Sequence, residues 1–191
     1  MIKKEINFRD RKLVFIDLET TGLDIFKHEI VEIGILVVDG RTLKITNRYH
    51  ARIKPKHLKT ADPESLKISG YSEKKWEKAR DIKEVLEEVV TLASDAMVAG
   101  WKVDFDWYML DKYLKKYNIK HTFDYHLIDV ISMAYKYFYR KEKPKELSLG
   151  NVCKILGIPI HEKHSEGLGH NAMDDIIATY EVFKRLMEDE I

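Results

Sequence analysis

The stretch from Leu13 to Gly22 constrains the fold of this chain more than any other part of the sequence. It reads Leu-Val-Phe-Ile-Asp-Leu-Glu-Thr-Thr-Gly, an apolar run that ends in two carboxylates and a turn signal. Such a run predicts a strand over residues 13–19 that is buried on both faces, near the centre of a helix-covered sheet. Because side chains alternate along a strand, Asp17 and Glu19 share one face, with their positions roughly 7 Å apart.

Two like charges at the mouth of a buried strand repel each other and resist desolvation. A divalent cation held between Asp17 and Glu19 would remove both costs. The alternative is that these two acids only solubilise the end of the strand. The sequence must therefore supply further ligands before a metal site is favoured.

The segments that follow predict an α/β fold whose sheet opens with three strands. Short connections join the strand at 13–19 to strands at 30–38 and about 42–53, which indicates an antiparallel meander. Apolar residues at helical spacing then alternate with short strands. We expect helices near 82–93, about 106–117, 130–140, 148–156 and from about 170 onward, and strands at 96–99 and 126–129.

A second acidic clue lies in the predicted helix after Gly100. Leu110, Tyr113, Leu114 and Tyr117 form its apolar stripe, and Asp106 stands four residues before Leu110 on that same stripe. A carboxylate on a core-facing stripe is costly unless it is paired or bound to a metal. The alternative for Asp106 is an ordinary N-terminal charge favoured by the helix macrodipole.

A third clue is the sequence His-Asn-Ala-Met-Asp-Asp from His170 to Asp175, at the start of the last helix. Asp174 and Asp175 lie at similar angles from the centre of the apolar stripe, so periodicity does not choose between them. Acids in a first turn are also common capping residues. The stripe itself predicts that this helix buries Met173, Ile177, Tyr180 and Met187.

These three clues occur in one order along the chain, and together they resemble a known family. Asp17-x-Glu19, Asp106, and His170 spaced ahead of Asp175 are similar to the motifs of the DEDDh branch of DnaQ-like 3′–5′ exonucleases, which include the proofreading exonucleases of bacterial DNA polymerase III. Phe15 to Leu23 matches the first motif, and Phe105-Asp106 the second. The resemblance implies a ribonuclease H-like mixed sheet, antiparallel in its first three strands and then parallel, flanked by helices.

The resemblance also implies a mechanism with two Mg²⁺ or Mn²⁺ ions. Oxygen ligands suit these ions better than zinc. By resemblance, Asp17 bridges both ions, Glu19 and Asp175 hold the first, and Asp106 serves the second. His170, whose free imidazole has a pKa near neutrality, is expected to act as the general base, so activity should fall on the acid side.

Contacts with the substrate are expected around the first and second motifs. Many relatives carry His-Asn ahead of the second motif, where this chain has Trp101-Lys102, and Trp101 either stacks on a base or packs in the core. Lysines near 54–59 and 74–80 either face phosphates or are ordinary solvated surface. The expected substrate-binding residues are Leu18, Thr20, Thr21, Gly22, Trp101, Lys102 and Phe105.

Composition bounds the remaining choices. The 33 basic and 32 acidic residues leave a net charge of +1, so any nucleic-acid surface must be local. One cysteine among 191 residues fits a reducing cytoplasm, and no apolar run reaches transmembrane length. We expect a single domain over residues 1–191. The absence of Gln and the richness in Lys, Glu and Ile are typical of hyperthermophile proteins.

The sequence therefore predicts a 3′–5′ exonuclease that acts on single-stranded 3′ ends, with DNA proofreading or repair preferred over RNA trimming. A DNA polymerase is a possible partner, and the oligomeric state is open. A catalytically quiet exonuclease fold that serves as a nucleic-acid-binding or scaffold subunit is one alternative. A metal phosphohydrolase acting on small phosphate esters is another.

Overall fold

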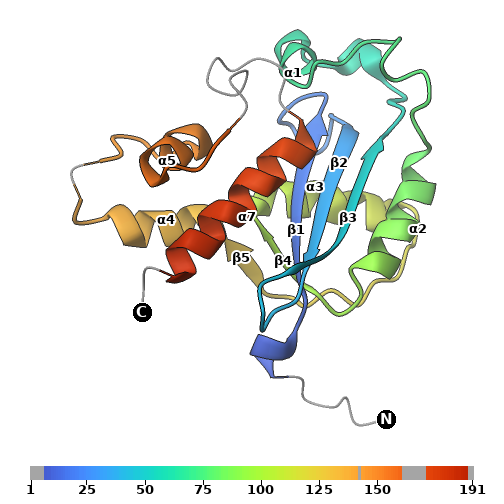
Figure 1. Cartoon of the computed structure of the whole chain (residues 1–191). Coiled ribbons are helices and arrows are strands. Elements are labelled where there is room, and N and C mark those ends of the chain that lie inside the picture. The colour runs from blue at the N-terminus through green and yellow to red at the C-terminus, as the bar shows by residue number, and fades with distance from the viewer. Residues whose placement is uncertain (1–6, 142, 161–170, 189–191) are drawn as a thin grey trace.

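A five-stranded mixed sheet forms the centre of the molecule (Figure 1). The computed structural model describes residues 7–141, 143–160 and 171–188. In the sheet the strands have the order β3-β2-β1-β4-β5; β1, β2 and β3 pair antiparallel, and β4 and β5 run parallel to β1. This confirms the predicted mixed sheet. The strands are β1 (Leu13–Thr20), β2 (Ile30–Val38), β3 (Ile45–Arg52), β4 (Met97–Gly100) and β5 (Leu127–Asp129).

Helices cover both faces of this sheet (Figure 1). Helices α2 and α3 contribute to the hydrophobic core on one face, and α4, α5 and α7 to the core on the other. Short 3-10 turns lie at Phe8–Asp10 and Leu58–Thr60. The helices are α1 (Pro63–Ile68), α2 (Ile82–Leu92), α3 (Val103–Lys116), α4 (Val130–Phe138), α5 (Leu149–Leu156) and α7 (Ala172–Glu188).

Strand β1 lies in the middle of the sheet and is buried along almost its whole length. Val14 and Ile16 pack with the α2 and α3 core, whereas Leu13 and Phe15 pack with the α4, α5 and α7 core. This alternation places Asp17 and Glu19 on the α7 side of the sheet. The predicted shared face of the two acids is confirmed.

Helix α7 is fixed to β1 by aromatic contacts. The Phe15 ring meets Tyr180 and Phe183 edge to face, with ring centroids 5.6 and 5.3 Å apart. Such edge contacts add roughly 0.5–1.5 kcal/mol each beyond the area they bury. The predicted buried face of this helix was partly wrong, because Met187 is exposed, whereas Met173 and Ile177 are partly buried. The residues that α7 buries are Ala172, Ile176, Ala178, Thr179, Tyr180, Val182, Phe183 and Leu186.

Strand β3 begins at Ile45, three residues later than predicted. The carboxylate of Asp39 accepts hydrogen bonds from the backbone N–H groups of Arg41 and Thr42, and Leu43 has a φ of 53°. These residues therefore form the turn between β2 and β3 rather than strand. Among the described residues, none of the helices combines the length and the apolar character needed to span a membrane.

Candidate active site

Three carboxylates from distant parts of the sequence meet at the end of β1. Asp17, Glu19 and Asp175 each offer an oxygen, and these oxygens lie within 4.8 Å of one another. Glu19 is buried, while Asp17 and Asp175 keep partial exposure to solvent. Three oxygen donors at this spacing are the ligand set that Mg²⁺ or Mn²⁺ prefers. The chemistry of the donors therefore fits a divalent ion.

The position of Asp175 follows from how α7 lies on the sheet. Its residues Tyr180 and Phe183 hold Phe15, so the helix runs antiparallel to β1 and its first turn reaches Asp17. A Cβ at Gly34 would come within 2.6 Å of the carbonyl oxygen of Ala172. Only glycine lets the start of α7 approach β2 this closely. The geometry thereby selects Asp175 for the cluster, a choice that periodicity alone left open.

Asp106 approaches β1 from the first turn of α3. The pairing of β4 with β1 ends at Phe15, three residues before Leu18. The backbone N–H of Leu18 donates to Oδ1 of Asp106 at 3.0 Å instead. Asp106 is buried, with 5% of its surface exposed. Its carboxylate thus pairs a backbone N–H of β1 that lies beyond the end of β4. Its charge acts on Asp17 and Glu19 and helps to raise the pKa of each.

Without a bound cation, the four neighbouring carboxyl groups disfavour one another's ionised form. Burial raises the pKa of Asp17 well above its usual range, and the charges of Asp106, Asp175 and Glu19 add to the effect. Burial, followed by the charge of Asp175, raises the pKa of Glu19 from 4.5 to about 8. Burial also raises the pKa of Asp106. Clustered carboxyl groups with raised pKa values are typical of functional sites.

A fifth acid, Glu32, lies beside the cluster and was not among the predicted site residues. In the antiparallel register Glu32 is paired with Glu19, and only 2% of its surface is exposed. Its Oε1 accepts the backbone N–H of Ala172 at 3.2 Å, which satisfies an otherwise unpaired donor at the start of α7. One acid in the otherwise apolar sequence Ile-Val-Glu-Ile-Gly-Ile-Leu-Val-Val was the available signal.

Two basic side chains on β3 lie beside Glu32. His50 Nε2 lies 3.0 Å from Oε1 of Glu32, and Arg52 Nε lies 3.5 Å from Oε2. Arg52 also donates to the carbonyl of Lys75 at 3.0 Å and stacks over Trp76 with its guanidinium carbon 4.7 Å from the ring centroid. Glu32 thus has two basic neighbours on β3, whereas neither of them forms an ion pair with Asp17 or Glu19 within the described part of the chain.

The residues after Glu19 form a tight turn that ends β1. The hydroxyl of Thr20 donates to the carbonyl of Gly22 at 2.8 Å, and the hydroxyl of Thr21 accepts the N–H of Glu29 at 2.9 Å. Gly22 has a φ of 151°, and a Cβ there would lie 2.3 Å from the ring of His28. The two hydroxyls are thus engaged in this turn. Contact of Leu18, Thr20, Thr21 and Gly22 with substrate stays a prediction.

The residues between β4 and α3 lie close to Asp106 in sequence and differ in exposure. Trp101 is partly buried against the core that α7 covers, and Phe105 is partly buried against the opposite core. Lys102 is exposed, adopts a left-handed φ of 56°, and donates its N–H to Asp129 at 3.0 Å. Their roles toward a substrate also stay predictions. His170, the expected general base, lies outside the described residues.

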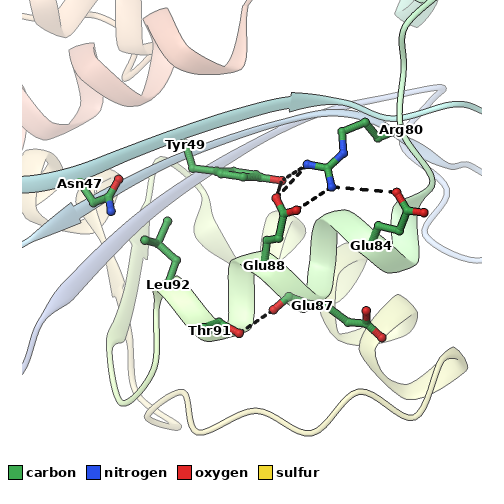
Figure 2. A pocket seen from close by; sticks show the side chains of 8 residues that line it. All are labelled: Asn47, Tyr49, Arg80, Glu84, Glu87, Glu88, Thr91 and Leu92. Atoms are coloured by element: carbon green, nitrogen blue, oxygen red, sulfur yellow. Dashed lines mark hydrogen bonds and ion pairs between the residues drawn. The ribbon is translucent and has the colours of Figure 1, made fainter.

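A groove of about 740 Å³ lies elsewhere on the molecule, between β3 and α2 (Figure 2). There Arg80 donates two hydrogen bonds to Glu88, at 2.8 and 2.6 Å, and the hydroxyl of Tyr49 donates to the same carboxylate at 2.8 Å. These polar groups satisfy one another. Since α2 covers the opposite face of the sheet from α7, this groove is separate from the carboxylate cluster.

Comparisons with known proteins agree with this geometry. The family model described as exonuclease matches residues 14–183. The chain is 30% identical over 188 residues to the PolC-type DNA polymerase III of Thermotoga maritima, covering 98% of this chain but 13% of the polymerase. It is 28% identical to the DNA polymerase III subunit epsilon of Aquifex aeolicus, covering 98% of this chain and 86% of that protein.

Solved structures show the same fold at lower identity. The nuclease domain of 3′hExo, described as a DEDDh family member bound to rAMP, superposes with a TM-score of 0.72 at 17% identity, over 93% of this chain and 92% of that chain. Escherichia coli exonuclease I in complex with a dA16 oligonucleotide gives a TM-score of 0.74 at 17% identity, over 94% of this chain and 41% of that one. These similarities confirm the predicted ribonuclease H-like architecture.

Proposed function

Because the chain belongs to the exonuclease family, we propose that it removes nucleoside 5′-monophosphates from single-stranded 3′ ends by metal-dependent hydrolysis. The observation that carries this proposal is the meeting of Asp17, Glu19 and Asp175 within 4.8 Å, with Asp106 bound to the same strand. Two divalent ions, when bound, would supply an activated water and stabilise the charge on the departing 3′ oxygen.

Each acid has a role that its position supports. Asp17 lies centrally, since the charges of all three other acids act on it, and we assign it to both ions. Glu19 and Asp175 would hold the first ion. Asp106 would serve the second while its Oδ1 stays on the Leu18 N–H. His170 precedes Asp175 by five residues and is proposed as the base that takes a proton from the attacking water.

DNA is the substrate that we favour. The two relatives described above are named as DNA polymerase III proteins, and we propose a DNA polymerase as a partner on the same ground. RNA trimming is the second candidate, because the chain is also 25% identical over 181 residues to an oligoribonuclease of Corynebacterium glutamicum. Matched DNA and RNA oligonucleotides of one sequence, digested side by side, distinguish these substrates.

The two neighbouring acids on α7 provide a matched pair of variants. We expect Asp175→Asn to lose at least 100-fold in the release of mononucleotides from a labelled 3′ overhang, with either Mg²⁺ or Mn²⁺. Asp174→Asn removes an equal charge one residue away, outside the carboxylate cluster, and should keep activity within about threefold. Equal activity of the two variants would contradict the assignment.

The same assay separates the rival functions. A chain that binds the overhang but releases no nucleotide with any divalent ion would be a catalytically quiet binding subunit. A chain that hydrolyses p-nitrophenyl phosphate faster than the overhang would be a small-ester phosphohydrolase. Asp17→Asn serves as the negative control in both cases, since it removes the acid that we assign to both ions.

A further inference from the structure

Helix α4 carries a surface whose chemistry the carboxylate site does not use. One side of α4 buries Val130, Ala134 and Phe138 in the core that α7 covers. The other side exposes Tyr135 and Tyr139, with 59% and 69% of their surfaces accessible and ring centroids 5.7 Å apart. Large exposed aromatic side chains one helical turn apart form a continuous apolar patch. We call these two residues, with Arg140, Lys143 and Lys145, the α4 surface.

Charge is concentrated at this surface. Residues 135–145 contain five Lys or Arg residues and one acid, a net charge of +4, whereas the whole chain has +1. The other 180 residues therefore carry a net charge of −3. Within the described parts of the chain, no carboxylate forms an ion pair with Arg140, Lys143 or Lys145.

Three cations in other exposed segments have partners within the protein. Lys56 pairs with Asp81 at 3.1 Å, and Arg80 pairs with Glu88 at 2.6 Å. Lys75 donates to the carbonyl of Gly70 at 3.3 Å. These three residues belong to the two lysine-rich segments that the sequence suggested for phosphate contact, whereas Lys54, Lys59, Lys74 and Lys78 of the same segments form no ion pair within the described part of the chain. The α4 surface is distinguished by two exposed aromatic rings beside its cations, which makes it a candidate for binding a single strand.

The α4 surface is connected to the carboxylate end of the sheet. Strands β4 and β5 run parallel to β1, so their carboxyl ends lie toward the edge where Asp17 and Glu19 are found. Helix α4 starts directly after β5, and Asp129 at that junction accepts the N–H of Lys102. At 1.5 Å per residue, Tyr135 and Tyr139 lie roughly 8 and 14 Å along the helix from Val130.

We propose that the α4 surface binds the single strand on the 5′ side of the nucleotide being removed. This rests on the proposed exonuclease function. Bases stack on Tyr135 and Tyr139, and phosphates contact Arg140, Lys143 and Lys145. Aromatic platforms flanked by cations are the usual means of holding single strands without sequence preference. A substrate of a single nucleotide has no 5′ strand to place on this surface, so only longer strands can use it.

The test compares a long and a minimal substrate in the full chain. The double variant Tyr135→Ala/Tyr139→Ala should raise KM for a 20-nucleotide single strand at least tenfold. It should leave hydrolysis of the p-nitrophenyl ester of thymidine 5′-monophosphate within twofold. Tyr125→Ala is the matched control, because Tyr125 is 85% exposed but precedes β5, at the opposite end of that strand. This control should not change KM for either substrate.

A second variant tests the phosphate contacts. Arg140→Ala/Lys143→Ala should flatten the salt dependence of binding, since each lost phosphate contact on a single strand lowers the slope of log K against log[salt] by roughly 0.7. Binding is measured by fluorescence anisotropy of the labelled 20-nucleotide strand on the Asp17→Asn background, where cleavage is absent. An unchanged slope would overturn the assignment of these cations.

The outcomes separate this proposal from the exonuclease proposal itself. Unchanged KM for the long strand in the tyrosine variant, or an equal loss on the long strand and the small ester, overturns the role of the α4 surface. If the unmodified chain cleaves neither substrate, the exonuclease proposal fails. The anisotropy measurement then still decides whether the α4 surface binds single strands.

Discussion

The acidic cluster should make the metal-free protein less stable than a variant that lacks one of its charges. Glu19 has a pKa raised from 4.5 to about 8 by burial and by the charges of Asp175, Glu32 and Asp106. Between these two pH values the folded protein holds a proton that the unfolded chain has released. The free energy of unfolding therefore falls as the pH rises from about 4.5 to 8.

The size of this effect follows from the pKa difference. At about 1.4 kcal/mol for each pKa unit, ionised Glu19 costs the folded state roughly 5 kcal/mol above pH 8 and roughly 3 kcal/mol at pH 7. Below pH 5 the cost is under about 1 kcal/mol. Glu19→Gln has the same shape and no charge, and its amide can donate to the neighbouring carboxylates. We expect this variant to be at least 2 kcal/mol more stable than the original at pH 8 without metal.

Urea unfolding in EDTA, followed by the fluorescence of the three tryptophans, measures this difference at pH 5 and pH 8. Glu87→Gln on the exposed side of α2 is the control and should change stability by less than about 0.5 kcal/mol. Saturating Mg²⁺ should then stabilise the original protein more than the Glu19 variant, because the variant has lost a ligand. A Glu19→Gln protein no more stable than the original at pH 8 would refute the reasoning.

Three further predictions concern the frame and the chemistry of the site. Gly34→Ala should destabilise the protein by roughly 1–3 kcal/mol and reduce nuclease activity, since its Cβ would collide with the carbonyl of Ala172; urea unfolding and the overhang assay measure both. Nuclease activity should fall below about pH 6.5 as His170 becomes protonated, and His170→Ala should flatten that acid limb of the pH–rate profile. The purified chain should stay folded on prolonged heating near roughly 70 °C, and an ordinary mesophile melting curve by circular dichroism would contradict the compositional argument.

The strand-borne half of the site could be predicted from the sequence because it depends on local geometry. Alternation along β1 alone places Asp17 and Glu19 on one face. The helical stripe that contains Asp106 likewise identifies a carboxylate that must face inward, and the structure finds it buried. In both cases one period, of 2 or 3.6 residues, determines the direction of the side chain.

The other half depends on contacts between segments far apart in sequence. Asp174 and Asp175 are equivalent on an isolated helix, and which of them joins the cluster depends on how α7 packs on the sheet. Gly34, about 140 positions earlier in the chain, lets the start of α7 approach β2. The error at Met187 has a related cause. Helix α7 buries small residues such as Ala172 and Thr179. A hydrophobicity scale ranks these residues below methionine, but their small side chains let the helix pack closer to the sheet.

The register of the sheet explains why Glu19 carries a large electrostatic cost although the start of α7 beside it is held in place. Glu19 on β1 is paired in register with Glu32 on β2, and Glu32 is paired with Arg52 on β3. Two acids and one base therefore lie side by side across the three antiparallel strands. Arg52 and His50 lie beside Glu32, whose carboxylate also accepts the N–H of Ala172 at the start of α7. Glu19 is left with acidic neighbours on both sides, Asp175 and Glu32. Glu32 thus positions the start of α7, which carries Asp175, while the electrostatic cost falls on Glu19, where a bound divalent cation would relieve it.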